Sequence, residues 1–495
     1  AAVGIGSAFL AAWSPAQRAV RMQPAELLVP GRQQDLPRAS ARAWCITGIV
    51  LLFLGAIFAI TALPPSGPPS LALAACLALQ LGAACLSPWL IQGWTRCIRK
   101  LTKKRFPLFS LANNDLAQSS GTVAVAVSAS AVTLAMLIGL GVMIHSFRAS
   151  VDQWISGTLK ADLYIAPAES EVLGTKAFLP HSAITALRQL PDLRAFETYR
   201  ETAVRLDPAL SETPFTLTAV APSAIDTLAF KERSDSNASP GEQFAQASAD
   251  NRVVIISEPM ARRSGLKVGS NFTLPTPAGA KEVEVIAVVT DYSDERGRFY
   301  IPARQFALWW DDDRINSLGI TFNEEATIHP DEVRALIAKD GEFAIYTNQK
   351  LRGRVMEIFD QTFAITNILR MIAIFVAVIG IILSLTVLVL ERSREIATLR
   401  AVGASRPQIA QIYILVAVVM AILFTLLGIA CGLLLAIMLT EVVNPAFFGW
   451  TIPLHAAWTD LLITPFWTIA VAALAGLVPA WRATTKPISQ SLRSE

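Results

Sequence analysis

Six long runs of uncharged, mostly apolar residues constrain this sequence more than any other feature. They lie at 46–63, 70–91, 122–144, 371–390, 409–440 and 461–481. About 20 apolar residues in a helix span the hydrocarbon core of a bilayer, so each run predicts a transmembrane helix. Only 16% of the 495 residues are charged, whereas roughly a quarter are charged in soluble globular domains. The sequence therefore excludes an ordinary soluble enzyme and predicts an α-helical transmembrane bundle.

Lys and Arg residues are distributed unevenly among the polar segments. The segments 13–44, 92–120, 391–408 and 482–495 hold five, six, four and three of them, and the loops 64–70 and 441–460 hold none. Short basic loops stay in the cytoplasm, whereas a long polar domain crosses the membrane whatever its charge. We therefore predict that the basic segments are cytoplasmic and that residues 146–362 are extracytoplasmic. The net charge of +3 provides no basic field for nucleic acid.

A short motif is repeated near the two ends of the chain. Pro15-Ala16-Gln17-Arg18-Ala19 follows the apolar stretch Ala1–Trp13, and Pro479-Ala480-Trp481-Arg482-Ala483 closes the last run. In both places a Pro ends a span and an Arg anchors it at the cytoplasmic face. We interpret residues 1–28 as the last piece of an earlier copy of a repeat unit, and the chain as a C-terminal fragment of a longer arrangement.

The long polar segment mixes β-rich runs with helical patterns, which predicts an α+β domain of about 200 residues. The predicted strands are 162–165, 215–220, 253–257 and 282–289, and the predicted helices are 182–190 and 330–339. Residues 271–274 and 282–289 are expected to pair as a hairpin. Residues 231–251 are polar and are expected to form a mobile insertion.

Apolar residues recur every three or four positions on both sides of this domain. They are Phe147, Val151, Trp154 and Ile155 after the third run, and Leu351, Val355, Ile358 and Phe359 before the fourth. A helix over 122–159 would be about 57 Å long, nearly twice the roughly 30 Å hydrocarbon core. We predict a two-helix stalk that carries the outer domain. The alternative is that these residues only pack the base of the domain.

The cytoplasmic segment 391–408 has the pattern of a short helix, a sharp turn and a second helix start. Ile396, Leu399 and Val402 fall on one face. Gly403 favours the end of one helix. Ser405 with Gln408 forms a capping box for the next helix. From the residues alone, the segment is either a functional contact or only a well-built connector.

The sequence of this segment resembles a known family. Residues 395–405, Glu-Ile-Ala-Thr-Leu-Arg-Ala-Val-Gly-Ala-Ser, are similar to the cytoplasmic signature of the FtsX-like permease family, the membrane subunits of MacB-type (type VII) ABC systems. The Pro-Ala-x-Arg-Ala endings resemble the family's closing motif, and residues 253–289 resemble its periplasmic core domain. One span, a large outer domain and three further spans over 121–483 follow the family's order. The preceding pair of spans resembles the linker of ten-span members.

The resemblance implies a permease subunit in the bacterial plasma membrane whose coupling helix docks on a separate, dimeric ATPase subunit. Ile396, Leu399 and Val402 would enter a groove of the ATPase, and Glu395 and Arg400 would orient the contact. The implied work is export or extraction of a lipid, lipoprotein, peptide or amphiphilic drug. The alternative is a signalling or mechanotransmission module that regulates an extracytoplasmic partner such as a cell-wall hydrolase. The residues assigned to the coupling helix are Glu395, Ile396, Leu399, Arg400, Val402, Gly403, Ala404 and Ser405.

These observations divide the chain into twelve segments. They are 1–13, the end of the last span of a missing first repeat; 14–44, a cytoplasmic linker; 45–92, two linker transmembrane helices; 93–120, a cytoplasmic basic segment; 121–145, a transmembrane helix; 146–362, the extracytoplasmic domain with its stalk; 363–391, a transmembrane helix; 392–408, the coupling helix; 409–440, a transmembrane helix; 441–460, an extracytoplasmic loop; 461–481, a transmembrane helix; and 482–495, a cytoplasmic tail. Besides the ATPase, the expected partners are the missing repeat or a second permease, the bilayer and, in the alternative function, an outer protein.

Residue types that would indicate other functions are missing or scattered. The sequence has no G-x-x-x-x-G-K-[ST] motif, so ATP and Mg²⁺ are expected on the partner, and no cofactor is expected in this chain. The span interiors hold no Asp, Glu, Lys, Arg or His residue, which argues against a secondary transporter or a channel. Four scattered His residues and the five Cys residues give no catalytic or metal site. The acidic groups around Asp291, Asp294 and Glu295, and at 311–313, are interpreted as solvated turns.

Overall fold

The computed structural model describes most of the chain between Ala39 and His455. The described residues are 13, 39–63, 67–101, 107–118, 120–173, 177–208, 210, 213–234, 238–247, 252–323, 330–391, 393–455, 463, 466–471, 473–477 and 481. Apart from Trp13 and Trp481, the predicted span remnant 1–13, the two repeat motifs and the tail 482–495 lie outside these residues. So does most of the linker 14–44.

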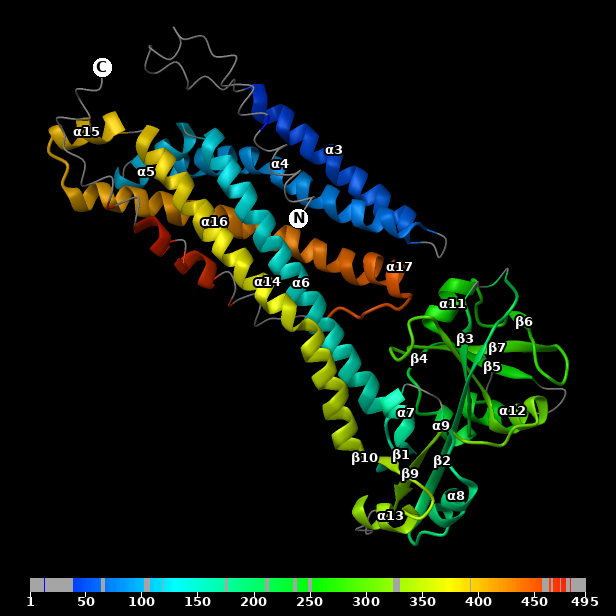
Figure 1. Cartoon of the computed structure of the whole chain (residues 1–495). Coiled ribbons are helices and arrows are strands. Elements are labelled where there is room, and N and C mark those ends of the chain that lie inside the picture. The colour runs from blue at the N-terminus through cyan, green and yellow to red at the C-terminus, as the bar shows by residue number, and fades with distance from the viewer. Residues whose placement is uncertain are drawn as a thin grey trace.

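A bundle of long helices is joined to a separate domain of strands and short helices (Figure 1). Within the described residues, four helices are long and apolar enough to cross a bilayer. They are α3 (Ala39–Ala62), α4 (Pro69–Leu101), α6 (Ser120–Thr158) and α16 (Arg406–Met438), the last continued by η2 (Leu439–Val443) and α17 (Asn444–Phe448). A shorter apolar helix, Phe466–Leu477, lies within the run predicted at 461–481. The predicted fold class, a helical membrane bundle with an outer α+β domain, is confirmed.

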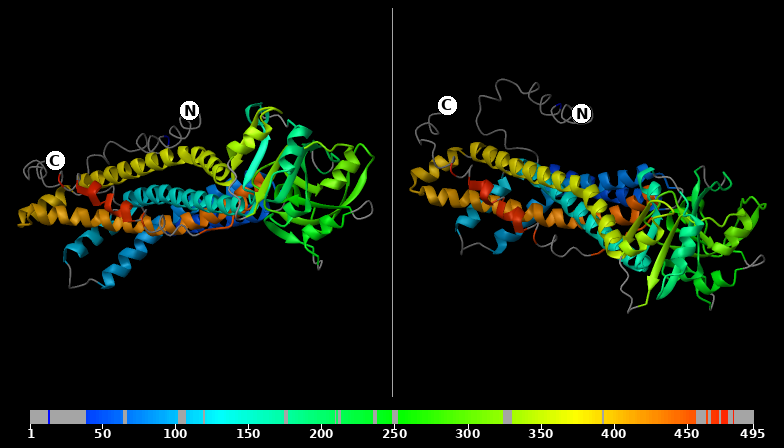
Figure 2. Two further views of the ribbon diagram at one scale, coloured as in Figure 1. Left: turned by 90° about the horizontal axis from the view of Figure 1, so that it is seen from below. Right: turned by 60° about the horizontal axis from the view of Figure 1, so that its bottom comes forward.

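Helix α14 (Asn348–Glu391) contains the fourth apolar run and extends far beyond it. Near the cytoplasmic end the chain bends by 63° between residues 374–390 and 395–401. The second of these segments is the short helix α15 (Ser393–Ala401). Helix α14 therefore joins the outer domain at one end and α15 at the other (Figure 2).

The centre of the bundle is the contact between α6 and α16, where glycines allow a close approach. A Cβ atom at Gly428 would lie 2.9 Å from the Leu134 side chain, and one at Gly432 would lie 2.8 Å from Ile138 Cβ. Two glycines four residues apart let the backbones of neighbouring membrane helices come together. The surrounding core includes Val416, Met420 and Phe424.

Residues 93–120, predicted as a cytoplasmic basic segment, contain helices that the sequence analysis did not identify. Helix α4 continues through them to Leu101, and α5 (Pro107–Gln118) follows after a short break. Ala112 and Leu116 of α5 are buried in the bundle core. Arg99 and Lys100 lie in the last turn of α4, where basic side chains stabilise the helix end. Their charges indicated a cytoplasmic segment but did not by themselves indicate a helix.

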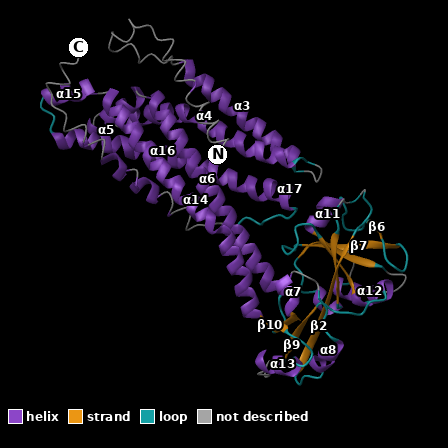
Figure 3. Cartoon of the chain, in the orientation of Figure 1, coloured by secondary structure: helices purple, strands orange, loops and turns teal. Residues whose placement is uncertain are grey.

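The outer domain is built on a sheet of ten described strands in the order β10-β1-β9-β2-β3-β8-β5-β7-β4, with β6 beside β7. The β3–β8 and β5–β7 pairs are parallel and the other pairs are antiparallel. Figure 3 shows the strands separated from the bundle. The strands are β1 (Leu163–Pro167), β2 (Leu193–Val204), β3 (Phe215–Val220), β4 (Phe230–Arg233), β5 (Val253–Ser257), β6 (Asn271–Leu274), β7 (Lys281–Val289), β8 (Arg298–Pro302), β9 (Ser317–Phe322) and β10 (Phe343–Thr347).

Two lobes share this sheet. In the lobe next to the stalk, α8 (His181–Arg188) and α13 (Pro330–Ile337) pack on β1, β9 and β10. In the other lobe, β5, β7 and β8 are buried on both faces, by α11 (Glu258–Ser264) and α12 (Ala303–Trp310) on one side and by α9 (Pro222–Ile225) and α10 (Pro240–Ala245) on the other. Strand β2 joins the lobes because its first half pairs with β9 and its second half with β3. The remaining helix, α7 (Ala168–Leu173), follows β1.

Residues 231–251, expected to form a mobile insertion, contain regular structure where they are described. Strand β4 pairs with β7. In α10, Ser239 caps the helix by accepting a hydrogen bond from the Glu242 N–H, and the Glu242 carboxylate accepts one from the Ser239 N–H. Phe244 is 2% exposed in the domain core. The capping box and the buried Phe244 ring order this polar segment. The composition of the segment indicated neither feature.

Candidate functional site

Helix α15 lies at the end of the bundle that is farthest from the outer domain (Figure 1). Gly403 ends it with φ of +108°, a conformation that glycine adopts without strain. The Ala404 N–H donates to Leu399 O at 2.9 Å and the Gly403 N–H to Arg400 O at 3.1 Å, which is the hydrogen-bond pattern of a Schellman cap. The Ser405 N–H then donates to Gln408 Oε1 at 2.8 Å at the start of α16. The turn between the helices is therefore tightly defined.

The residues predicted to dock on a partner do not all face outward. Ile396 is 6% exposed and belongs to the bundle core, whereas Leu399 is 37% and Val402 is 85% exposed. Ile396 is therefore a structural residue that fixes α15 to the bundle, and its assignment to an external groove is corrected. Glu395, Ala401, Gly403 and Ser405 are exposed, and Arg400 and Ala404 are half-buried.

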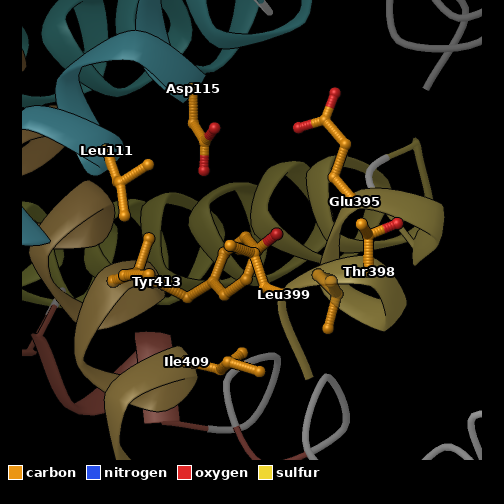
Figure 4. Close-up of a pocket in the computed structure, with 9 residues that line it drawn as sticks. Leu111, Asp115, Glu395, Thr398, Leu399, Ile409 and Tyr413 are labelled. Carbon is orange, nitrogen blue, oxygen red and sulfur yellow. The ribbon is translucent and has the colours of Figure 1, made fainter. Parts of the chain in front are cut away.

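A pocket of about 310 Å³ opens beside α15, between α5, α15 and the start of α16. Figure 4 shows that Asp115 from α5 and Glu395 from α15 extend into the space between these two helices. The lining residues are Leu111, Asp115, Glu395, Ile396, Thr398, Leu399, Ile409, Ile412 and Tyr413. The pocket thus has an apolar floor and two carboxylates from different helices. Sequence reasoning missed it because α5 itself was not predicted.

Six of the eight predicted stalk residues come together where α6 and α14 leave the bundle. Phe147, Val151, Trp154, Ile155, Val355 and Phe359 form one apolar cluster. Leu351 is half-buried, and Ile358 is 58% exposed. Consecutive helical residues point about 100° apart, so when Phe359 faces α6 its neighbour Ile358 faces away. Ion pairs of Arg148 with Asp360 and of Arg352 with Asp152 flank the cluster.

Aromatic rings extend this cluster into the outer domain and to the end of α16. The ring centroid of Tyr292 lies 5.7 Å from Phe147, 5.9 Å from Trp154 and 5.7 Å from Trp450, all in edge-to-face geometry. The Tyr292 hydroxyl donates to Thr451 O at 3.3 Å. Burial raises the pKa of Tyr292 to about 12, so the hydroxyl keeps its proton at neutral pH. We call Phe147, Trp154, Tyr292 and Trp450 the ring junction.

A polar contact lies beside the ring junction. Glu258 of α11 is 5% exposed. Its carboxylate lies 2.5 Å from Lys231 Nζ and accepts a hydrogen bond from the Thr451 hydroxyl at 3.3 Å. Arg262 of α11 also donates to Leu63 O, at the end of α3, at 3.2 Å. Sequence reasoning missed these residues because they are far apart in the chain, and no local pattern relates Lys231 to Thr451.

The acidic groups considered earlier as solvated turns are partly buried and paired. Asp291 is 2% exposed and accepts hydrogen bonds from the Tyr300 hydroxyl at 2.9 Å and the Ser293 N–H at 2.8 Å. Asp312 is paired with Arg200 at 2.7 Å and Arg314 at 2.9 Å. The solvated-turn interpretation is therefore wrong for both. Among the described residues, no group of three His, Cys, Asp or Glu side chains is arranged to hold a metal ion.

Comparisons with known proteins cover most of the chain. Residues 123–339 match the family model for the MacB-like periplasmic core domain, and residues 367–488 match the model for the FtsX-like permease C-terminal region. An uncharacterised ABC transporter permease protein of Mycobacterium tuberculosis is 25% identical over 499 aligned positions, which cover all of this chain and 57% of the relative. The lipoprotein-releasing system transmembrane protein LolC of Haemophilus influenzae is 29% identical over 125 residues, 25% of this chain and 31% of LolC. The chain therefore spans less than two thirds of the length of either relative.

Two solved structures match about two fifths of this chain at low sequence identity. The periplasmic region of MacB from Actinobacillus actinomycetemcomitans is 15% identical, with a TM-score of 0.31, over 41% of this chain and 95% of that one. The extracellular domain of the noncanonical ABC-type transporter YknZ from Gram-positive bacteria is 15% identical, with a TM-score of 0.27, over 38% of this chain and 99% of that one.

Proposed function

We propose that this chain, a multi-pass inner-membrane protein of the FtsX-like permease family with a MacB-like periplasmic core domain, couples ATP hydrolysis by a separate subunit to work outside the membrane. ATP and Mg²⁺ bind to that ATPase subunit, because this sequence has no phosphate-binding loop. The work is export or extraction of a lipid, lipoprotein, peptide or amphiphilic drug. Residues 399–402, at the end of α15 and directly after it, are the docking contact.

One observation carries this proposal: α15 is connected at both ends to helices that reach the outer domain. Helix α14 runs from α15 into β10. Helix α16 leads through η2 and α17 to Trp450 and Thr451, which contact Tyr292 and Glu258 of the outer domain. A displacement of α15 is therefore passed outward along two routes, since packed helices move as rigid elements.

The exposed part of α15 suits a protein contact. Val402 is 85% exposed and Leu399 is 37% exposed at the cytoplasmic end of the bundle. Because the Schellman cap and the restart of α16 define the turn, the two side chains are held in place before a partner binds. Such preorganisation lowers the entropy cost of association.

Replacing Val402 by Glu tests the docking assignment. The side chain is exposed, so the fold tolerates the change, but a charge would be buried at the interface with the ATPase. The matched control is Leu308→Glu, because Leu308 is 71% exposed on α12 of the outer domain. We expect Val402→Glu to lower co-purification of the ATPase at least tenfold and Leu308→Glu to leave it unchanged. Full retention with Val402→Glu contradicts the assignment.

The alternative function, regulation of an outer protein without transport, shares this coupling and differs in what the outer domain handles. Purification of the intact complex in nanodiscs separates the two. Bound lipid or amphiphile that is released on ATP hydrolysis supports extraction or export. A stoichiometric protein partner held by residues 146–362, with no substrate released on hydrolysis, supports the regulatory module.

A further inference from the structure

Helices α3 and α4, which lie side by side at one edge of the bundle (Figure 1), belong to a stretch of unbalanced positive charge. Residues 36–114 contain eight Lys and Arg residues and no Asp or Glu. Four of the eight lie in described parts of the helices: Arg42 near the start of α3, and Arg96, Arg99 and Lys100 near the end of α4. All four are exposed, and within the described residues none of them forms an ion pair. Their charge is therefore available to an anion from outside the chain.

One face of α4 aligns two of these charges with a tryptophan. Trp89, Gly93, Arg96 and Lys100 follow one another at spacings of four, three and four residues, which places them on the same side of a helix. All four are exposed. The opposite side of α4 packs into the bundle core, where Ile91 is 0% exposed. We call the four exposed residues the basic stripe.

Two tryptophans mark the level of the cytoplasmic bilayer surface on this helix pair. A Cβ at Gly48 of α3 would lie 3.2 Å from Cys85 Cβ of α4. Trp44 is one turn before Gly48 and Trp89 one turn after Cys85, so the two indoles lie at similar depth, 51% and 55% exposed. Tryptophan is enriched at membrane–water interfaces. At 1.5 Å per residue, the Arg96 backbone lies about 10 Å beyond that of Trp89.

The Arg96 side chain lies back toward the lipid. Side chains on a helix tilt toward its N-terminus, which in α4 is the extracytoplasmic end. Arg96 Nη2 accordingly donates a hydrogen bond to Gln92 Oε1 at 3.2 Å, one turn closer to the bilayer. Between Trp89 and Arg96, Gly93 leaves open space, because a Cβ there would meet nothing within 4 Å. An anionic group therefore has access to the helix surface between an indole and two cations.

We propose that the basic stripe binds the headgroup of an anionic phospholipid of the cytoplasmic leaflet. The phosphate lies over Gly93, within reach of Arg96 and Lys100, and the acyl chains extend past Trp89 toward Leu81, which is 57% exposed. Basic residues directly cytoplasmic of a membrane helix attract anionic lipids. Membrane orientation alone requires positive charge on this side, but it does not require that the charge be aligned with a tryptophan and an open gap. The inference is independent of ATPase docking on α15.

Competition between two lipids tests the charge of the stripe. Phosphatidylglycerol and phosphatidylcholine are added in equal amounts to the full chain in detergent, and the retained lipid is identified by native mass spectrometry. We expect the wild type to retain phosphatidylglycerol selectively. The double variant Arg96→Gln with Lys100→Gln should bind it roughly twentyfold more weakly, since each basic residue near an anionic surface contributes about fivefold. The matched control is Lys267→Gln with Arg304→Gln, two exposed residues of the outer domain, which should bind like the wild type.

A steric variant tests the gap with every charge in place. Gly93→Leu adds a side chain where space is open, so the thermal unfolding midpoint should not fall, but the phosphate loses its approach to the helix. We expect about tenfold weaker retention of phosphatidylglycerol. Selective retention by the double variant at the wild-type level overturns the proposal, and so does an equal loss in the outer-domain control. Equal binding of the two lipids by the wild type also overturns it, because no charge would then be recognised. Wild-type retention by Gly93→Leu contradicts the placement of the phosphate over Gly93.

Discussion

Helices α14 and α16 both leave α15 and both end at the outer domain, yet they are packed very differently. Helix α16 is buried on nearly every turn, against α6 above all. Among the α14 side chains whose burial is described, those fully buried in the bundle lie near its cytoplasmic end, at Leu385, Leu388 and Val389, and Val378 and Ile382 are partly buried against the core. Along its middle α14 exposes several apolar side chains: Ile365, Ile368, Met371, Ile372, Phe375, Val376, Ile379 and Leu383.

In the proposed coupling, this difference gives the two helices different mechanical roles. Apolar side chains exposed in hydrocarbon cost little, because lipid tails are as apolar as leucine. Helix α14 can therefore shift against the bundle without breaking a packed core, whereas α16 moves only together with α6. The two routes meet again at the ring junction, because Phe359 of α14 contacts Phe147, and Tyr292 contacts both Phe147 and Trp450.

The largest expected difference between α16 and α14 is the stability cost of replacing a glycine by a larger residue. Gly432→Leu forces a side chain into a space where even a Cβ would lie 2.8 Å from Ile138 Cβ, whereas a Cβ at Gly380 of α14 meets nothing within 4 Å. Overpacking at such contacts costs about 3 kcal/mol. We expect Gly432→Leu to lower the unfolding free energy in detergent by that amount and Gly380→Leu to change it by less than about 0.5 kcal/mol. Equal losses would mean that α14 is packed as tightly as α16.

Removal of the central ring tests whether the two routes are joined. Tyr292→Ala deletes the ring contacts with Phe147, Trp154 and Trp450, and we expect a loss of about 2 kcal/mol in stability. Tyr292→Phe keeps the rings and removes only the hydrogen bond to Thr451, for a loss of about 1 kcal/mol or less.

The matching functional readout is the distance between spin labels at Leu308 of α12 and Leu426 of α16, both exposed. We expect ATP addition to the complex to change this distance in the wild type and in Tyr292→Phe, but not in Tyr292→Ala. A normal response in Tyr292→Ala would show that the ring junction does not transmit motion.

The elements that the sequence predicted well are those with local signals. Strands 215–220 and 253–257 coincide with β3 and β5, because their residues form short apolar runs between turn signals. The capping box and Gly403 predicted the turn after α15, since helix ends depend on residues three or four positions apart. The stalk follows from helical periodicity that continues past the membrane run.

What the sequence did not predict depends on contacts between distant segments. Whether Ile396 faces the bundle or a partner is decided by the packing of α5 and α16 on α15, which no local pattern contains. The pocket, the ring junction and the Lys231–Glu258 pair bring together residues separated by tens to hundreds of positions. Helix α5 was not predicted because the cluster of basic residues before it, at 99–105, was taken as typical of the whole segment 93–120.

Two ion pairs, one on each helical route, are expected to differ by a smaller amount in their contribution to stability. Lys231 pairs with Glu258, whose side chain is 7% exposed, on the α16 route; Arg352 pairs with Asp152, both 43% exposed, on the α14 route. Removal of a partner leaves a buried carboxylate uncompensated, but a solvated one is stabilised by water. We expect Lys231→Gln to cost about 1.5 kcal/mol and Arg352→Gln about 0.5 kcal/mol or less in thermal unfolding. The reverse order would place the stronger attachment on α14.

The smallest effect is expected at Asp312, which follows α12 in the chain. Helix α12 lies on the side of the outer domain away from the bundle (Figure 1). Hydrogen bonds from the Arg314 side chain, then from Arg200, hold the pKa of Asp312 below its ordinary value of 3.8. A carboxylate with a lowered pKa in the folded state stabilises the protein above its unfolded pKa and loses this contribution as the pH falls through the folded value. The stability difference between wild type and Asp312→Asn should therefore be constant from pH 5 to 8 and shrink below about pH 4. Because the Arg314 side chain is 59% exposed and screened by water, the difference should be about 2 °C or less in midpoint temperature. The nucleotide-dependent distance should be unchanged, because Asp312 touches neither helical route; a lost response would mean that the far lobe takes part in coupling.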